Sequence, residues 1–185
     1  MASVGGLSEL NSAPRTVAFC MLESMVEKSP WVAERVLDLR PFASADDIAQ
    51  KLVDVILEAG YEKRFALFRV HPELAGREAV AGTMTQASTS EQGRLGLTSL
   101  TPREAARLAS MNAAYAKRFG YPFILALHRI PDRAAVFDIF ERRLAASPVE
   151  EHVSTLAEIA SVIAARVAQV FEHAPTSQSA EIAGG

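Results

Sequence analysis

Helix-start signals recur along this chain, and they constrain its fold more than any other feature. Thr101 is followed three residues later by Glu104, and Ser147 is followed in the same way by Glu150. In each pair the hydroxyl can cap the first turn of a helix while the glutamate side chain reaches back to the capping residue. Both pairs also place proline at the first helical position, where no N–H is needed. The pattern favours a chain built from helices.

Further helix starts follow the same logic. They are Ser29 before Pro30, Ser44 before Asp47, and Ser88 before Glu91, the last of which also fits a capping box. Between the starts, apolar residues recur at intervals of three and four, which is the spacing of one helical face. Caps and periodicity together predict about eight helices. Their expected positions are 16–28, 30–39, 44–59, 62–70, 88–98, 102–119, 132–146 and 148–173.

A length of 185 residues suits one domain with a substantial core. We therefore predict an all-α fold with a single compact domain over residues 15–173, and flexible tails at 1–14 and 174–185, which are rich in small and polar residues. Residues 75–87 show no clear period and are expected to be a functional loop or to hold an unrecognised helical turn. The run from Phe123 to Ile130 is expected to be a short buried helix or an extended segment.

Composition excludes several classes of function. The chain is 49% hydrophobic with a formal net charge of −3 and no run of cations, so nucleic acid is not an expected partner. We expect no stretch to be long enough for a membrane span, and the N-terminus lacks the pattern of a secretory signal, which makes the cytoplasm the expected location. Cys20 lies in an apolar segment and is expected to be a buried thiol.

Known metal and cofactor motifs are also missing. The sequence holds no HExxH, no CxxC and no glycine-rich phosphate loop, and the other histidines do not follow a metal-ligand spacing. We expect neither a metal nor a cofactor. Acid–base chemistry by side chains remains open.

His71 is the first candidate for such chemistry. It stands directly before Pro72, and a residue before proline is disfavoured in the α conformation, so the imidazole is expected at a helix end. Its ordinary pKa suits an acid or base near neutrality. Taken alone, a histidine in this position more often caps a helix or fills the core than takes part in catalysis.

Two other side chains could take part in catalysis, but each also has an ordinary structural explanation. Glu91 completes a capping box with Ser88 and needs no further role to explain it. Arg166 lies at the flank of an apolar helix face, where an arginine either extends to solvent or directs its planar fork into a pocket. A fork that points inward would suit a carboxylate or a ureido group with paired acceptors.

Read together in order, the motifs resemble a known family. The segments SPWVA, RPF, HPEL, STSEQ, MNAAYAKRFGYPFI, ERRL and EIASVIAARV are similar to those of the 2-oxo-4-hydroxy-4-carboxy-5-ureidoimidazoline (OHCU) decarboxylases of urate breakdown. The order and the gaps agree over roughly residues 10 to 172. The resemblance implies an all-helical, cofactor-free enzyme that converts OHCU to (S)-allantoin and carbon dioxide, and it suggests a homodimer.

The resemblance also implies the site. It assigns His71, Glu91 and Arg166 as catalytic residues. It assigns substrate contacts to Pro72, Ser88, Thr89, Ser90, Gln92, Phe123, Ile124, Leu125, Ala126 and Leu127. Two alternatives remain at this stage: a helical binding or scaffold protein whose His71 and Glu91 only cap helices, and a cofactor-free lyase that acts on another ureido compound.

Overall fold

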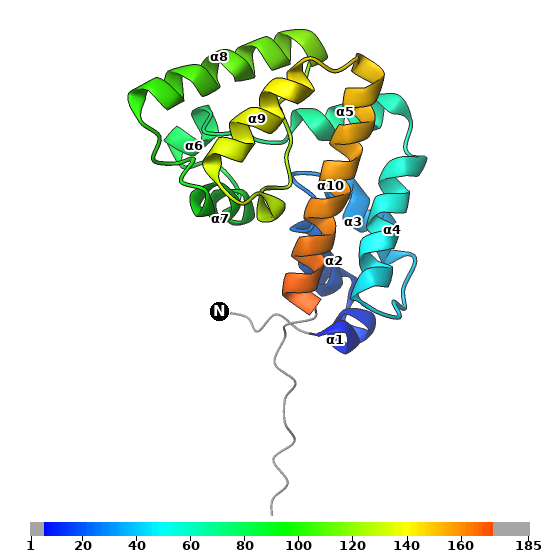
Figure 1. Cartoon of the computed structure of the whole chain (residues 1–185). Helices are drawn as coiled ribbons and strands as arrows, with labels where there is room; N and C mark the ends of the chain where they lie inside the picture. The colour runs from blue at the N-terminus through cyan, green and yellow to red at the C-terminus, as the bar shows by residue number, and fades with distance from the viewer. Residues whose placement is uncertain (1–5, 172–185) are drawn as a thin grey trace, which may run out of the picture.

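Ten α-helices and one short 3-10 helix occur within residues 6–171, the part of the chain that this computed structural model describes (Figure 1). No strand occurs among these residues, so the predicted all-α class is confirmed. The helices are α1 (Leu7–Ser12), α2 (Arg15–Glu23), α3 (Pro30–Leu37), α4 (Ala45–Glu58), α5 (Tyr61–Arg69), α6 (Arg77–Ala81), α7 (Gln86–Arg94), α8 (Pro102–Phe119), η1 (Leu127–Arg129), α9 (Arg133–Leu144) and α10 (Pro148–Phe171).

Most of the predicted caps are present. Thr101 and Glu104 form the full capping box of α8, and Ser147 and Glu150 exchange the same pair of hydrogen bonds at the start of α10. The Ser44 hydroxyl accepts a hydrogen bond from the backbone N–H of Asp47 at 3.1 Å. These interactions are local, which explains why the sequence identifies them.

The long helix α10 organises one half of the molecule. It lies lengthwise against α4, and α3 packs against both α2 and α4 (Figure 1). The inward face of α10 buries Ile159, Ile163, Val167 and Phe171. Helices α6 to α9 form the other half, with α8 packed on α9. A continuous apolar core joins the two halves.

Some expectations were wrong in detail. Residues 7–12, assigned to the N-terminal tail, form α1, which buries Leu10. By contrast, the stretch 75–87 contains the short helix α6, which agrees with the unrecognised helical turn that was one of the two expectations for it. The helix expected over 16–28 ends at Glu23, because the chain turns sharply before Pro30. The first five residues and the predicted tail at 174–185 lie outside the described residues.

The expected burial of Cys20 was also wrong, because this side chain is exposed. Helix α2 buries Ala18 and Leu22, and Cys20 stands two residues from each of them. At 100° per residue that spacing places it on the opposite face.

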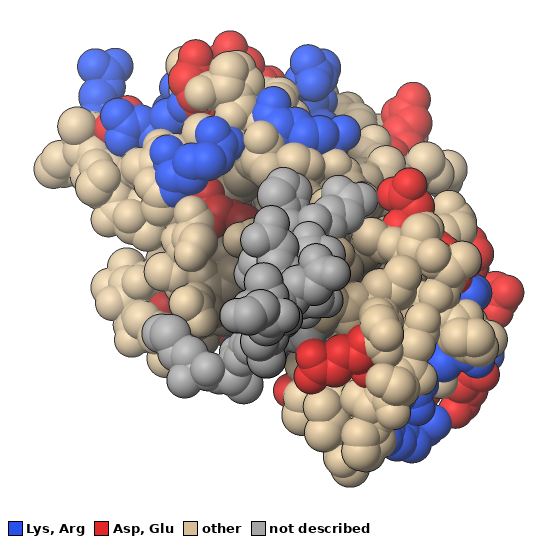
Figure 2. Space-filling view, turned by 90° about the horizontal axis from the view of Figure 1, so that it is seen from below, with Lys and Arg blue, Asp and Glu red and all other residues tan. Residues whose placement is uncertain are grey.

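One described helix, α10, has the length and apolar composition of a membrane span, so the expectation that no stretch reaches that length was wrong. The core helices of globular proteins meet the same criteria, so a single such helix is a weak indication. Here α10 buries the charged residues Glu151 and Arg166, and each of them is ion-paired within the protein. In the view of Figure 2 the described cations lie in separate groups among acidic residues.

Candidate active site

His71 follows the end of α5, as its position before Pro72 predicted. The backbone N–H of His71 still donates to Phe68 O at 3.3 Å, and then the chain leaves the helix. The ring Nδ1 lies 2.9 Å from Leu67 O. A carbonyl oxygen only accepts, so Nδ1 carries the ring proton. Nε2 of the neutral ring is therefore the basic nitrogen.

The surroundings of His71 keep it neutral. Burial lowers the pKa of His71 to about 4, because an imidazolium loses hydration inside the protein. The hydrogen bond to Leu67 and the negative charge of Glu27 raise the pKa, while the cationic Arg166 and Lys28 lower it. Near pH 7 the Nε2 atom is therefore unprotonated and can accept a proton.

Glu91 lies on the inner face of α7 and does not cap this helix. Helix α7 begins at Gln86, and its N-cap is Thr85, whose hydroxyl accepts from the backbone N–H of Ser88. The predicted capping box of Ser88 and Glu91 is thus wrong, since the helix starts earlier. Both residues lie within the helix, three positions apart, and so share a face.

The Glu91 carboxylate is bound by Arg166. Arg166 Nε donates to one oxygen at 2.9 Å and Nη2 donates to the other at 3.1 Å, which forms a bidentate pair. The Arg166 side chain is 9% exposed, so of the two options that the sequence left open the arginine takes the inward one. This pair links α7 to α10.

Glu27 is a site residue that the sequence gave no reason to select. It lies in the turn between α2 and α3, and its side chain is 1% exposed. Its Oε2 accepts hydrogen bonds from Ser88 Oγ at 2.9 Å, Thr85 Oγ1 at 3.1 Å and Arg166 Nη1 at 3.4 Å. An acidic residue near the end of an expected helix is ordinary, so only the fold shows this role.

The extended segment that precedes η1 forms another wall of the site. Its backbone lacks a partner strand and is held by side chains instead. Arg143 Nη1 donates to Ile124 O at 2.7 Å, and the N–H of Ala126 donates to Glu158 Oε2 at 2.8 Å. Arg94 donates to the carbonyl of Leu127. The segment is therefore fixed at several points without a sheet.

The segment after His71 is held by two amide side chains. Gln92 Oε1 accepts from the N–H of Ala75 at 2.8 Å, and Gln92 Nε2 donates to Glu73 O at 3.3 Å. From α8, Asn112 Nδ2 donates to Leu74 O at 2.9 Å. These contacts position the turn that carries His71 and Pro72.

A small cavity of about 40 Å³ lies where these elements meet. Ten of the predicted site residues line it, and Leu74 and Val162 complete the wall, although the sequence did not select them. The lining residues are His71, Pro72, Leu74, Ser88, Glu91, Gln92, Phe123, Ile124, Leu125, Leu127, Val162 and Arg166. The cavity thus joins a base, an ion pair and an apolar wall.

Three predicted contacts do not line this cavity. Thr89 and Ser90 are exposed, because the face of α7 that carries Ser88, Glu91 and Gln92 turns them toward solvent. Ala126 is buried in the wall, where its N–H is used by Glu158.

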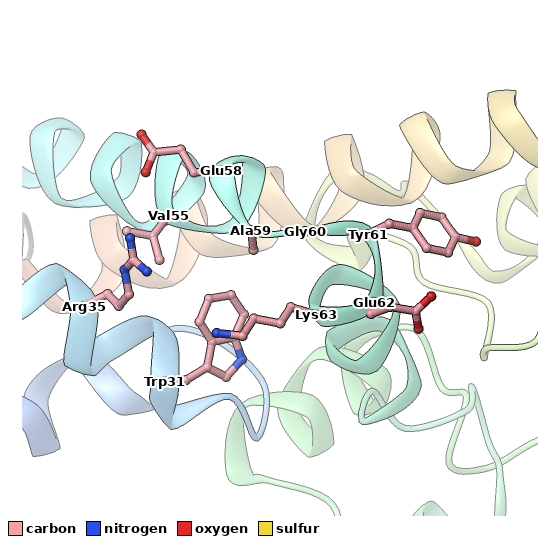
Figure 3. A pocket seen from close by; sticks show the side chains of 9 residues that line it. All are labelled: Trp31, Arg35, Val55, Glu58, Ala59, Gly60, Tyr61, Glu62 and Lys63. Atoms are coloured by element: carbon pink, nitrogen blue, oxygen red, sulfur yellow. The ribbon is translucent and has the colours of Figure 1, made fainter.

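A larger cavity of about 420 Å³ lies between α3, α4 and the start of α5 (Figure 3). Lys63 extends across the ring of Trp31 there, with its Nζ 5.5 Å from the ring centroid. None of the predicted site residues lines this cavity. Its charged residues are exposed and carry both signs, so the smaller cavity is the stronger candidate for chemistry.

Within residues 6–171, no group of three or more His, Cys, Asp or Glu side chains is arranged to hold a metal ion. The side chains that line the small cavity combine a neutral imidazole with a carboxylate and a guanidinium. Such a set can move a proton and bind an anion.

Comparison with known proteins identifies the same family that the sequence motifs resemble. The sequence profile of the OHCU decarboxylase family matches residues 11–168. The 2-oxo-4-hydroxy-4-carboxy-5-ureidoimidazoline decarboxylase of Mus musculus is 39% identical over 142 residues, which cover 75% of this chain and 78% of the mouse protein.

Two solved structures share the fold. A crystal structure of (S)-allantoin synthase matches with a TM-score of 0.71 and 22% identity, over 90% of this chain and 54% of that one. The chain thus spans about half of that protein. A crystal structure of an OHCU decarboxylase in the presence of (S)-allantoin matches with a TM-score of 0.63 and 17% identity, over 81% of this chain and 96% of the other. At such low sequence identity, the two matches support the fold of this chain and nothing further.

Proposed function

The chain belongs to the OHCU decarboxylase family, and from this premise we propose that it converts OHCU to (S)-allantoin and carbon dioxide with His71, Glu91 and Arg166 as its catalytic residues. The observation that carries the proposal is the meeting of these three side chains around one cavity. The family consists of decarboxylases, so the chain is an enzyme of that class and not the scaffold protein that the sequence also allowed.

The reaction needs few groups. Loss of carbon dioxide from C4 of OHCU leaves an electron pair that the neighbouring C5=N bond accepts. The C4 hydroxyl loses its proton as it becomes a carbonyl, while C5 and the ring nitrogen each gain one. The face of C5 that receives the proton sets the configuration of allantoin. One acid–base residue on a single face of the ring can therefore determine the product.

We assign that acid–base role to His71. Its Nδ1 is engaged by Leu67 O, which orients the ring and leaves Nε2 as the nitrogen that exchanges protons with the substrate. The apolar wall formed by Phe123, Ile124 and Leu125 would lie against the ligand ring and exclude water. Pro72 holds the imidazole at the end of α5 and away from the helix axis.

Arg166 and Glu91 have complementary roles in this proposal. The arginine fork binds a planar group with two acceptor oxygens, which the substrate offers as a carboxylate. Glu91 accepts the proton of the C4 hydroxyl or shares it with His71. Both oxygens of Glu91 are bound by Arg166 in the free site, so substrate that takes the fork also releases Glu91.

The size of the cavity agrees with such an exchange. A volume of about 40 Å³ accommodates a few water molecules, whereas OHCU is much larger. Separation of the Arg166–Glu91 pair widens the space between α7 and α10, and substrate binding thus starts with the side chains that the reaction uses.

The direct test generates OHCU from urate with urate oxidase and hydroxyisourate hydrolase and then adds this protein. We expect OHCU to disappear faster than by spontaneous decay and the allantoin to be enriched in the S enantiomer, as followed by circular dichroism. An unchanged decay rate and racemic allantoin would show that OHCU is not the substrate. A lyase that acts on another ureido compound would give that result.

Arg166→Lys tests the fork. A lysine has a single ammonium and cannot donate two parallel hydrogen bonds, so we expect KM for OHCU to rise roughly 10- to 100-fold, the equivalent of one charge-assisted hydrogen bond. The matched control is Arg107→Lys, since Arg107 forms an exposed ion pair with Glu141 and should leave KM unchanged. An unaltered KM in Arg166→Lys would mean that the substrate does not use the fork.

A further inference from the structure

Glu27 is a buried carboxylate at the candidate site to which the mechanism above gives no role. Its side chain is 1% exposed, although an ionised carboxylate is costly to remove from water unless it is well paired. The pairing here is one-sided. Oε2 accepts from Ser88, Thr85 and Arg166, whereas Oε1 is buried without a hydrogen-bond donor from any described residue.

The backbone around Glu27 is also unusual. Lys28, the next residue, has φ of 41°, in the left-handed region that a side chain with a Cβ rarely adopts. Strain of this kind persists where the surrounding structure requires a particular geometry. In this turn the strained residue directly follows the carboxylate that reaches the site.

The donors of Arg166 are divided between two carboxylates. Nε and Nη2 form the fork that faces Glu91, while Nη1 lies 3.4 Å from Glu27 Oε2. The Glu91 side chain is 29% exposed, whereas that of Glu27 is nearly inaccessible and is tied by two hydroxyls. A substrate anion can therefore displace Glu91 from the fork far more easily than it can displace Glu27.

We propose that Glu27 is a positioning residue: it holds Arg166 through Nη1 and fixes the hydroxyl of Ser88, so that the guanidinium stays in place while its fork exchanges Glu91 for the substrate carboxylate. This role rests on the proposed function of the site. It explains why a second carboxylate is buried beside an arginine that already has a bidentate partner.

The charge of Glu27 also acts on His71. Burial is the main cause that lowers the pKa of this ring, and the charges of Arg166 from α10 and Lys28 from the same turn lower it further. The hydrogen bond between Nδ1 and Leu67 O raises the pKa, as does the charge of Glu27, while Glu91 from α7 lines the same cavity. The charge of Glu27 thereby supports the protonated ring that forms during proton transfer. Removal of this charge should lower the pKa of His71 further.

Glu27→Gln tests the proposal with little change in shape. Glutamine keeps an oxygen for the hydroxyls of Ser88 and Thr85 but removes the charge that holds Arg166. We expect KM for OHCU to rise roughly 10-fold, the scale of one weakened charged hydrogen bond, with a smaller change in kcat. Glu141→Gln is the matched control, since Glu141 lies in an exposed ion pair and should leave KM unchanged.

A purely structural role predicts a different result. It would lower Tm and the active fraction, and so kcat, while KM stayed as in the wild type; that outcome overturns the proposal. If Glu27→Gln does not fold, Glu27→Asp keeps the charge and shortens the side chain by one carbon. The shorter side chain should no longer contact Arg166, so KM should rise. A wild-type KM in Glu27→Asp also overturns the proposal.

The pKa of His71, followed by NMR in the wild type and in Glu27→Gln, separates this inference from the proposed function. A lower pKa in the variant supports the position of Glu27 beside the ring even if the wild type fails to decarboxylate OHCU. An equal pKa in the two proteins contradicts it even if the wild type is active.

Discussion

His71→Ala is expected to reduce kcat for OHCU decarboxylation by about 10²- to 10⁴-fold, the range that a positioned acid–base residue contributes. The variant loses the one ring nitrogen that can exchange a proton on this side of the cavity. Its helices should remain, because His71 follows α5 and Pro72 still ends it. Steady-state kinetics gives the loss, and far-UV circular dichroism with thermal unfolding reports the fold.

His71→Asn separates catalysis from capping. The asparagine amide can still donate to Leu67 O, as Nδ1 of His71 does at 2.9 Å, but it has no group that titrates near neutrality. We expect His71→Asn to be as inactive as His71→Ala. Activity close to the wild type in the asparagine variant would mean that His71 only closes the helix and that another residue moves the proton.

Arg143→Met is expected to cost about 3–5 kcal/mol of folding free energy, because it leaves a buried carboxylate without its cation. The Arg143 side chain is 8% exposed and that of Glu151 is fully buried. Arg143 donates to both oxygens of Glu151, at 2.5 and 3.1 Å, and Tyr115 donates to the same carboxylate. Chemical denaturation monitored by circular dichroism measures the loss.

The same variant should also affect the site. Arg143 Nη1 holds Ile124 O at 2.7 Å and so fixes the wall of the cavity, and its loss should raise KM beyond what the lower stability explains. The double variant Arg143→Met/Glu151→Gln removes both charges and leaves an acceptor for Tyr115. The double variant should regain much of the lost stability, but its KM should stay above that of the wild type. A single variant as stable as the wild type would contradict the assignment of this pair.

Much of the fold follows from interactions between residues that are close in sequence. A capping box such as Thr101 with Glu104 spans three residues, and its hydrogen bonds form wherever that sequence begins a helix. The two missed helices, α1 and α6, have six and five residues and are too short to show a period. The exposed face that carries Cys20 was missed for a different reason, because residues 17–22 of α2 are all apolar and so do not distinguish its inner side from its outer side.

The motifs of the sequence resemblance selected His71, Glu91 and Arg166, but the residues alone left each of them with an ordinary explanation. The capping box assigned to Ser88 and Glu91 shows why. Two helix starts compete within four residues, and Thr85 forms the one that the fold uses. The choice depends on the side chains that α7 meets, which local sequence does not contain.

The sequence by itself determined most of the longer helices and the caps at Ser44, Thr101 and Ser147, because those depend on periodicity and on hydrogen bonds within one turn. Only the tertiary structure decided what the polar residues do. The Glu91–Arg166 pair joins residues 75 positions apart and the Glu27–Arg166 pair joins residues 139 apart. Such contacts exist only after α7, α10 and the turn before α3 have packed together, and burial then makes a matched partner necessary for each charge.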